Sequence, residues 1–147
     1  LGQGNKTEYL TDKPRPELLE TFENQHQDNL YVVPLECFEG SSLCPKTKQP
    51  DFFTLYINYI PDKKCVESKS VKLFIFSLRN HGEFMEDLTN RIMKELIKLL
   101  QPHYIEVYGK FNSRGGIYLR PYVNWYKNPN MKKGINNLLD RYYALSK

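Results

Sequence analysis

The segment FMEDLTNRIMKELIKLLQP, residues 84–102, decides the fold class. Its apolar side chains recur at the spacing of one helix face, at Met85, Leu88, Ile92, Leu96 and Leu99. Acidic residues before and within its first turn suit the positive end of a helix dipole, and Pro102 prevents the helix from continuing. The segment therefore predicts one long amphipathic helix.

Strand patterns lie on both sides of this helix. Residues 53–60 alternate apolar and polar side chains, and residues 71–77 are rich in β-branched and aromatic residues, so we expect two strands that pair with each other. Residues 104–111 and 117–123 predict two more strands, and residues 131–145 predict a final helix. This order predicts an α+β domain with helices packed on one face of an antiparallel sheet.

The sequence before these elements is less regular. Residues 1–28 are polar and contain prolines, which predicts an N-terminal extension with one helical turn, followed by a single domain over residues 29–147. Residues 30–33 predict an edge strand, because Pro34 cannot donate a ladder hydrogen bond. Two prolines and two serines in SSLCPKTKQPD, residues 41–51, predict a short constrained loop.

Composition excludes several classes of protein. Of 147 residues, 40% are hydrophobic and 14% aromatic, which excludes disordered, collagen-like and low-complexity chains. The 21 basic and 17 acidic residues give a net charge of +4, which is small for a dedicated nucleic-acid binder. No apolar run approaches the roughly 20 residues of a membrane span, and no secretory signal is visible. We therefore expect a cytoplasmic protein without membrane or nucleic-acid partners.

The open edges of a small sheet and the many aromatic residues predict association into a homo-oligomer. The common cofactor and catalytic signatures GxGxxG, GxxxxGK[ST], GxSxG and HExxH are absent. The histidines are scattered, and the spacing of Cys37, Cys44 and Cys65 fits neither a zinc site nor a disulfide framework. We expect reduced thiols and no metal.

Cys44 and Asp51 form the candidate catalytic pair. Cys44 lies in the predicted loop near Lys46 and Lys48, and neighbouring cations raise the thiolate fraction of a thiol. Asp51 lies seven residues further on, at the start of a strand, where a carboxyl can act as an acid. Taken singly, a free cysteine is usually a small buried hydrophobe, and an aspartate at this position is usually a turn or strand-entry residue.

Other polar residues have two interpretations each. Lys69 and Lys72 lie at the entry of the strand predicted at 71–77, and their odd spacing sends them to opposite faces unless the chain bends. Glu86 can bind a ligand or serve only as a helix-dipole partner, and Arg114 can be a turn residue or a phosphate clamp. Spacing alone does not separate these alternatives.

Three segments together closely resemble one family. They are SSLCPKTKQPDF (41–52), ESKSVKLFIFSLRNHGEFMEDL (67–88) and GKFNSRGGI (109–117). They resemble the NADPH-dependent 7-cyano-7-deazaguanine reductases of queuosine biosynthesis in their short single-domain form, over roughly residues 30 to 125. The resemblance implies a tunnelling fold like that of GTP cyclohydrolase I, with subunits joined into rings. These are typically two facing pentamers with sites at subunit boundaries.

The resemblance also implies roles for individual residues. Cys44 would be the nucleophile and Asp51 the acid. NADPH would bind without a dinucleotide fingerprint, held by Lys69, Lys72 and Arg114. The substrate base would be bound by Val66, Glu67, Ser68, Met85 and Glu86.

The implied chemistry makes these residue types intelligible. A nitrile carbon accepts hydride poorly, but addition of a thiolate converts it into a thioimide, an activated C=N group. Reduction of the nitrile of 7-cyano-7-deazaguanine to 7-aminomethyl-7-deazaguanine, a step toward queuosine in tRNA, takes four electrons. It therefore uses two NADPH per turnover.

The chain departs from the family at Met85, where the family ordinarily has a histidine before the helix glutamate. A thioether neither donates a hydrogen bond nor carries a proton. Met85 also lies on the apolar stripe of the predicted helix, where it can simply pack. His81, on the other side of Gly82, is a candidate substitute.

Other functions remain to be compared with this one. A tunnelling-fold hydrolase or pterin enzyme acting on a purine-like ring would need a Cys/His metal constellation that the sequence lacks. A nitrilase-like Cys-Lys-Glu hydrolase would form an acid and ammonia instead of an amine. A non-enzymatic basic module could bind single-stranded nucleic acid through its 11 tyrosines, but no RNP-type motif supports it.

Overall fold

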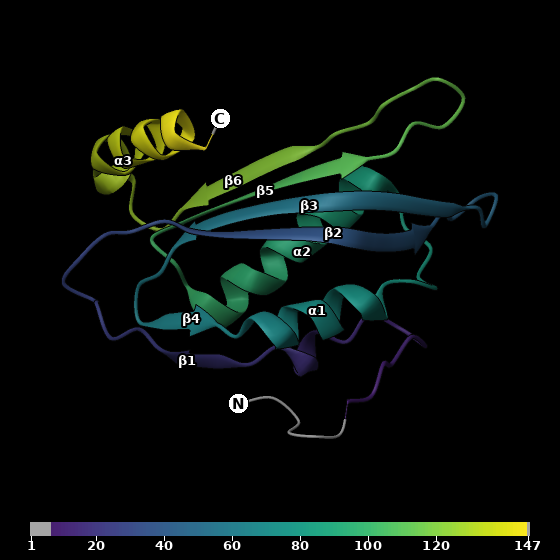
Figure 1. Ribbon diagram of the computed structural model, residues 1–147, viewed down its shortest axis with the longest axis horizontal. Helices are drawn as coiled ribbons and strands as arrows, with labels where there is room; N and C mark the ends of the chain where they lie inside the picture. The colour runs from purple at the N-terminus through teal and green to yellow at the C-terminus, as the bar shows by residue number, and fades with distance from the viewer. Residues whose placement is uncertain (1–6, 147) are drawn as a thin grey trace.

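A four-stranded antiparallel sheet forms the centre of the molecule, which a computed structural model describes over residues 7–146 (Figure 1). The order of its strands is β2-β3-β5-β6, and β1 and β4 pair antiparallel in a second, two-stranded sheet. The six strands are β1 (Thr21–Glu23), β2 (Val33–Leu43), β3 (Pro50–Ile60), β4 (Lys64–Val66), β5 (Tyr104–Phe111) and β6 (Tyr122–Tyr126).

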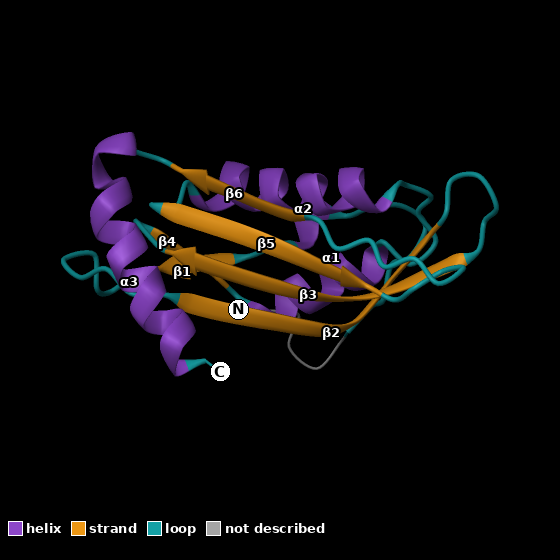
Figure 2. Ribbon diagram, turned by 90° about the horizontal axis from the view of Figure 1, so that it is seen from above, coloured by secondary structure: helices purple, strands orange, loops and turns teal. Residues whose placement is uncertain are grey.

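Two helices cover one face of the large sheet, and a third lies across one end of the other face (Figures 1 and 2). They are α1 (Ser68–Ser77), α2 (Met85–Leu100) and α3 (Lys132–Leu145), with short 3-10 turns at Pro16–Leu18 and Pro129–Met131. The α+β class and the long helix are therefore confirmed. The expectation that all helices lie on one face is wrong for α3.

The alternation of side chains along β3 explains this arrangement. Leu55, Ile57 and Tyr59 face α1 and α2 and join one buried apolar cluster with the apolar stripe of α2. Ile60, at the end of the strand, instead belongs to a second cluster with Ile135 and Leu139 of α3 together with Tyr104. The sheet thus has a continuous core on one face and a small apolar contact on the other.

A buried carboxylate lies beside that small contact. Glu106, on β5, is 5% exposed and accepts hydrogen bonds from the hydroxyls of Tyr104 and Tyr122 and from the Asn58 amide. Tyr143, on α3, also donates its hydroxyl to Glu106. The carboxylate therefore joins α3 to the sheet.

The strand predicted at residues 71–77 is in fact helix α1. Glu67 caps this helix, accepting hydrogen bonds from the backbone N–H groups of Lys69 and Ser70, both at 2.8 Å. The N-terminal segment covers the helix on the side away from the sheet: the N–H groups of Arg15 and Glu20 donate to the hydroxyls of Ser77 and Ser70. Because α1 is buried from both sides, it lacks the polar face by which a helix is recognised in a sequence.

This correction also changes the placement of the two lysines. Residues three apart on a helix lie on neighbouring positions of one side, so Lys69 and Lys72 project on the same side of α1. The pairing predicted between residues 53–60 and 71–77 is absent, since β3 pairs with β2 and β5.

Other boundaries differ from the prediction. The constrained loop predicted at 41–51 is shorter, because β2 extends to Leu43 and β3 begins at Pro50. The strand predicted at 30–33 begins only at Val33, but it does occupy a sheet edge, as expected from Pro34. The strand predicted at 117–123 lies later, at Tyr122–Tyr126, because the residues before it form an exposed loop. The single helical turn expected in residues 1–28 is the 3-10 turn at Pro16–Leu18.

Among the described residues, no helix has the length and apolar character needed to cross a membrane.

Replacement of Leu88 by alanine tests the principal core. Leu88 is fully buried where α2 packs on the sheet. We expect Leu88→Ala to lower the free energy of unfolding by about 2–5 kcal/mol, through lost apolar contact and the cavity left behind. Lys94→Ala, at an exposed position of the same helix, should change it by less than about 0.5 kcal/mol. Urea denaturation at one fixed protein concentration measures both, and equal effects would contradict the assignment of the core.

Candidate active site

The turn between β2 and β3 holds the candidate nucleophile. Cys44 follows directly on β2, and its N–H donates to the carbonyl of Gln49 at 2.8 Å, while the N–H of Lys48 donates back to the Cys44 carbonyl at 3.0 Å. These bonds close residues 44–49 into a compact turn, in which Lys48 adopts a positive φ of 63°. The position of the sulfur is thus set by a hydrogen-bonded turn instead of a mobile loop.

The surroundings of this sulfur favour the thiolate. The Thr47 hydroxyl, and then the backbone N–H groups of Thr47 and Lys46, donate toward Cys44 and lower its pKa to about 6. Burial of the side chain, which is 6% exposed, acts in the opposite direction, and the guanidinium of Arg114 adds a further lowering contact. At neutral pH the group is therefore mostly a nucleophilic thiolate.

Asp51 lies beside this turn in a contrasting environment. It is the second residue of β3, 3% exposed, and pairs in register with Ser42 of β2. Burial raises the pKa of its carboxyl, and the charge of Arg114 opposes that rise. A carboxyl with a raised pKa can hold a proton nearer neutral pH, as an acid catalyst requires.

Arg114 connects the two groups. Its Nε lies 3.0 Å from Asp51 Oδ1, so the two side chains form an ion pair. The Nε–H bond is not aligned on this oxygen, so the contact is not a hydrogen bond. The arginine comes from the loop between β5 and β6, where Gly115 and Gly116 have φ values of 59° and 79° that favour glycine. Three segments far apart in the sequence thus bring a thiol, a carboxyl and a guanidinium together.

A second group of predicted residues lies at the start of α1. Val66 is buried, and its N–H donates to the Tyr59 hydroxyl at 3.0 Å. Glu67 uses its carboxylate to cap α1, a structural role that the sequence analysis did not assign. Ser68 is exposed. A ten-residue helix is about 15 Å long. The residues at the start of α1 therefore lie about that far from the other end of the helix, where the chain continues toward the segment beside Cys44.

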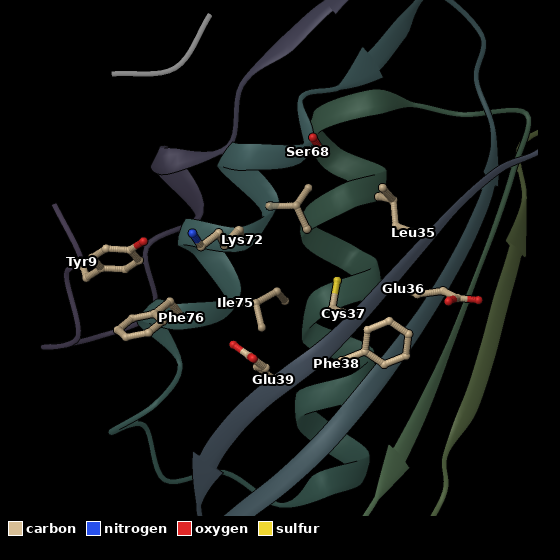
Figure 3. A pocket seen from close by; sticks show the side chains of 11 residues that line it. Tyr9, Leu35, Glu36, Cys37, Phe38, Glu39, Ser68, Lys72, Ile75 and Phe76 are labelled. Carbon is tan, nitrogen blue, oxygen red and sulfur yellow. The ribbon is translucent and has the colours of Figure 1, made fainter. Parts of the chain in front are cut away.

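A pocket of about 600 Å³ lies between α1 and the edge strand β2 (Figure 3). Ser68 and Lys72 line it, together with Cys37 and Phe38 of β2. The ammonium of Lys72 lies 5.3 Å from the centre of the Tyr9 ring. The pocket therefore contains part of the predicted binding set but not the Cys44 turn.

The start of α2 lies at the Cys44 end of the sheet. The segment before it is bound to β2: the Leu43 N–H donates to the His81 carbonyl at 2.9 Å, and the Glu83 N–H donates to the Leu43 carbonyl at 3.1 Å. Glu86 is exposed in the first turn of α2, as a binding role requires, whereas Met85 is buried in the core. The fold thus gives Met85 a packing role.

His81, the candidate substitute for the family histidine, is engaged in an ion-pair chain. Its Nε2 lies 2.7 Å from Glu83 Oε1, and Arg91 Nε donates to the same oxygen at 2.8 Å. Within residues 7–146, no cluster of three or more histidine, cysteine, aspartate or glutamate side chains is arranged to hold a metal ion.

The sequence analysis does not name two neighbours of the candidate catalytic pair. Thr47 donates to the thiolate, and Ser42 lies opposite Asp51. The spacing of Ser42 and Cys44 carried a usable signal, because residues two apart on a strand share a face. The prediction of a loop over residues 41–51 hides this signal.

Comparison with known proteins agrees with the resemblance. The family model described as QueF-like protein matches residues 50–130. An NADPH-dependent 7-cyano-7-deazaguanine reductase of Porphyromonas gingivalis is 60% identical over 124 residues, covering 84% of this chain and 80% of its own length. The protein of that name from Streptococcus mutans is 60% identical over 115 residues, covering 78% of this chain and 70% of its own.

A solved structure supports the fold. The crystal structure of the archaeosine synthase QueF-Like in the apo form matches with a TM-score of 0.60 and 23% identity, covering 66% of this chain and 94% of that chain. This likeness confirms the tunnelling fold. The family model matches more than half of the chain, and the reductase of Porphyromonas gingivalis aligns with most of the chain. The chain therefore belongs to the QueF-like family.

Proposed function

We propose that this protein reduces the nitrile of 7-cyano-7-deazaguanine to 7-aminomethyl-7-deazaguanine, with NADPH as the hydride donor. The observation that carries the proposal is the thiol with a pKa lowered to about 6 beside a buried carboxyl. It occurs in a chain that is 60% identical to reductases of that name. A thiolate and an acid are the two groups that nitrile reduction requires of the protein.

Cys44 begins the reaction as nucleophile. Its thiolate forms a bond to the nitrile carbon, one C–N π bond breaks, and the nitrogen takes up a proton, which gives a covalent thioimide. The low pKa supplies the thiolate without a separate base. The same low pKa makes the sulfur a good leaving group when the C–S bond breaks after the first hydride has been added.

Asp51 supplies the proton in this step. Conversion of nitrile to amine adds two hydrides and two protons, and each proton must reach the same nitrogen. The carboxyl lies beside the Cys44 turn and is buried, which favours its protonated form before transfer. Arg114 then stabilises the carboxylate that remains, since it already pairs with Asp51 Oδ1.

NADPH supplies hydride to the activated carbon when it is bound. The residues that would hold it are Lys69, Lys72 and Arg114. Their chemistry fits a cofactor with an extra phosphate, because the two lysines project from the same side of α1 and the Arg114 side chain is 39% exposed. Substrate recognition is assigned to Val66, Glu67, Ser68 and Glu86, and Met85, which precedes Glu86, packs in the core.

The complete site is assigned to a subunit boundary. Within one chain, the start of α1 lies about 15 Å, the length of that helix, from the end of α1 whose following segment is bound next to the Cys44 turn. Strand β2 lies at an open sheet edge beside the pocket that contains Ser68 and Lys72. A second copy paired at this edge would bring its own groups to the pocket, and we propose a homo-oligomer of two facing pentamers.

Mass spectrometry of the intact protein tests substrate and nucleophile together. Mixed with 7-cyano-7-deazaguanine alone, the wild type should gain the mass of the nitrile and lose it when NADPH is added. Cys44→Ala should show no gain. Cys37→Ala is the matched control, because burial raises the pKa of Cys37 to about 11 and leaves it unreactive, so this variant should react like the wild type. An adduct that persists in Cys44→Ala would remove Cys44 from the mechanism.

The pH dependence of alkylation tests the state of the thiol. Carbamidomethylation of Cys44 by iodoacetamide should rise through about pH 6 and level off above it, because only the thiolate reacts. Arg114→Gln should move the midpoint to higher pH, since a donor to the thiolate is lost. Arg79→Gln, an exposed arginine stacked on Phe76, should leave it unchanged. A wild-type midpoint near 8.5 would contradict the proposed activation.

Replacement of Asp51 by asparagine tests the acid. Asp51→Asn keeps the shape of the side chain but cannot deliver a proton, so NADPH oxidation should slow by about 10²–10⁴-fold. Stopped-flow absorbance of NADPH measures the rate. A loss smaller than threefold would assign proton delivery to another group.

A further inference from the structure

Two fully buried side-chain polar atoms within residues 7–146 have no hydrogen-bond partner, and they lie in the same place. They are Ser42 Oγ and Asp51 Oδ1. Ser42 is 0% exposed and Asp51 3%. Asp51 Oδ1 still has the ion pair with Arg114, so of the two only the Ser42 hydroxyl has no polar partner of either kind in the described part of the chain. A buried polar atom without a partner destabilises the folded state, so this hydroxyl requires an explanation.

The two residues are direct partners across the β2–β3 ladder. Side chains at directly opposed positions of antiparallel strands project on the same face, with Cβ atoms about 4.5–5.5 Å apart. Cys44 lies two residues after Ser42, and its N–H continues the pairing to Gln49. The hydroxyl, the thiol and the carboxyl therefore share one face at the end of the hairpin.

The backbone on both sides of Ser42 is held in place. Gly40, Ser41 and Ser42 pair in register with residues of β3. The next residue, Leu43, is bound by the segment before α2 through its N–H and its carbonyl. The hydroxyl is thus positioned by a hydrogen-bonded frame, which leaves rotation about the side-chain bonds as its main freedom.

A carboxyl that changes protonation state inside a protein has a particular requirement. As a carboxylate it accepts hydrogen bonds only, and as an acid it also donates one. Asp51 forms an ion pair with the guanidinium of Arg114 from the β5–β6 loop, and the same guanidinium contacts the thiolate of Cys44 in the turn. A guanidinium only donates and a thiolate only accepts, whereas a serine hydroxyl does both by rotating.

We propose that Ser42 is a positioning residue for Asp51, whose hydroxyl donates to the carboxylate and accepts from the carboxylic acid as the proton is transferred. This inference rests on the proposed function, in which Asp51 is the acid. The inference explains why an unpartnered hydroxyl is retained in the core. The hydroxyl destabilises the resting protein, but the reaction needs it.

Three variants test the proposal in the assembled, full-length protein. Ser42→Ala removes only the hydroxyl oxygen, and Ser42→Thr restores a hydroxyl. Ser41→Ala is the matched control, because Ser41 is the adjacent buried serine and projects on the opposite face of β2, where it pairs with exposed Phe52. Thermal unfolding, adduct formation and NADPH oxidation are measured for each.

The expected pattern separates a role in the reaction from a structural one. Ser42→Ala should keep or raise the melting temperature, because an unpartnered polar group is removed. It should still form the covalent adduct, but reduce it about tenfold more slowly. The alkaline limb of the rate profile should move up by roughly one pH unit, because a donor to the carboxylate is lost. Ser42→Thr should recover most of the rate, and Ser41→Ala should match the wild type.

Infrared titration makes the test independent of turnover. The carbonyl stretch of protonated Asp51, isolated by subtracting the spectrum of Asp51→Asn, should titrate at higher pH in Ser42→Ala than in the wild type. If the wild type forms no adduct, the proposed function fails, and the infrared shift still decides the role of Ser42. An unchanged titration and rate, or a loss of melting temperature in Ser42→Ala, would overturn the inference.

Discussion

The antiparallel pairing of β2 with β3 is the constraint on which the site depends. Its register places Ser42 opposite Asp51, and its closing turn sets the position of Cys44. One face of the hairpin near the turn carries the reactive groups, and the same face further along carries the core residues Phe53, Leu55 and Ile57. Because side chains alternate along a strand, a slip of one residue would move both sets to the wrong face. The register that buries the core is therefore also the one that places Ser42 opposite Asp51.

Close packing supports this pairing where β2 is irregular. The register shifts between Cys37 and Gly40, and Gly40 faces the ring of Phe53. A Cβ atom at residue 40 would lie 2.1 Å from Phe53 Cε2, so only glycine allows the ring to occupy this place. The ring in turn packs on Phe111, at 4.8 Å between centroids, which joins the hairpin to the strand that leads toward Arg114.

The sequence predicted elements whose patterns reflect one-sided burial. Helix α2 has a single apolar face and was predicted within a residue of its observed start. Helix α1 was mistaken for a strand because the sheet and the N-terminal segment bury it from both sides, which removes the helical period. Glu67 caps α1 and is the local signal for a helix at this position. A glutamate caps a helix only when its own backbone is extended, and the sequence does not reveal that conformation. Cys44 and Asp51 could be named as candidates because their residue types restrict the chemistry, and their roles stay a prediction. The contacts of Thr47, Ser42 and Arg114 could not, since they follow from the turn geometry and the register.

The attachment of α3 has a consequence for the dynamics of the molecule. Two of its residues, Ile135 and Leu139, are buried, and Tyr143 adds its bond to Glu106. By contrast, β3 and β5 lie in the interior of the sheet and carry much of the main core. Segments with few buried contacts open without unfolding the rest of a protein. The amide hydrogens of α3 should therefore exchange with solvent as one cooperative unit, at a lower free energy than those of the central strands. Exchange of this kind would make the C-terminal helix a separate foldon, one that opens while the Cys44 turn keeps its structure.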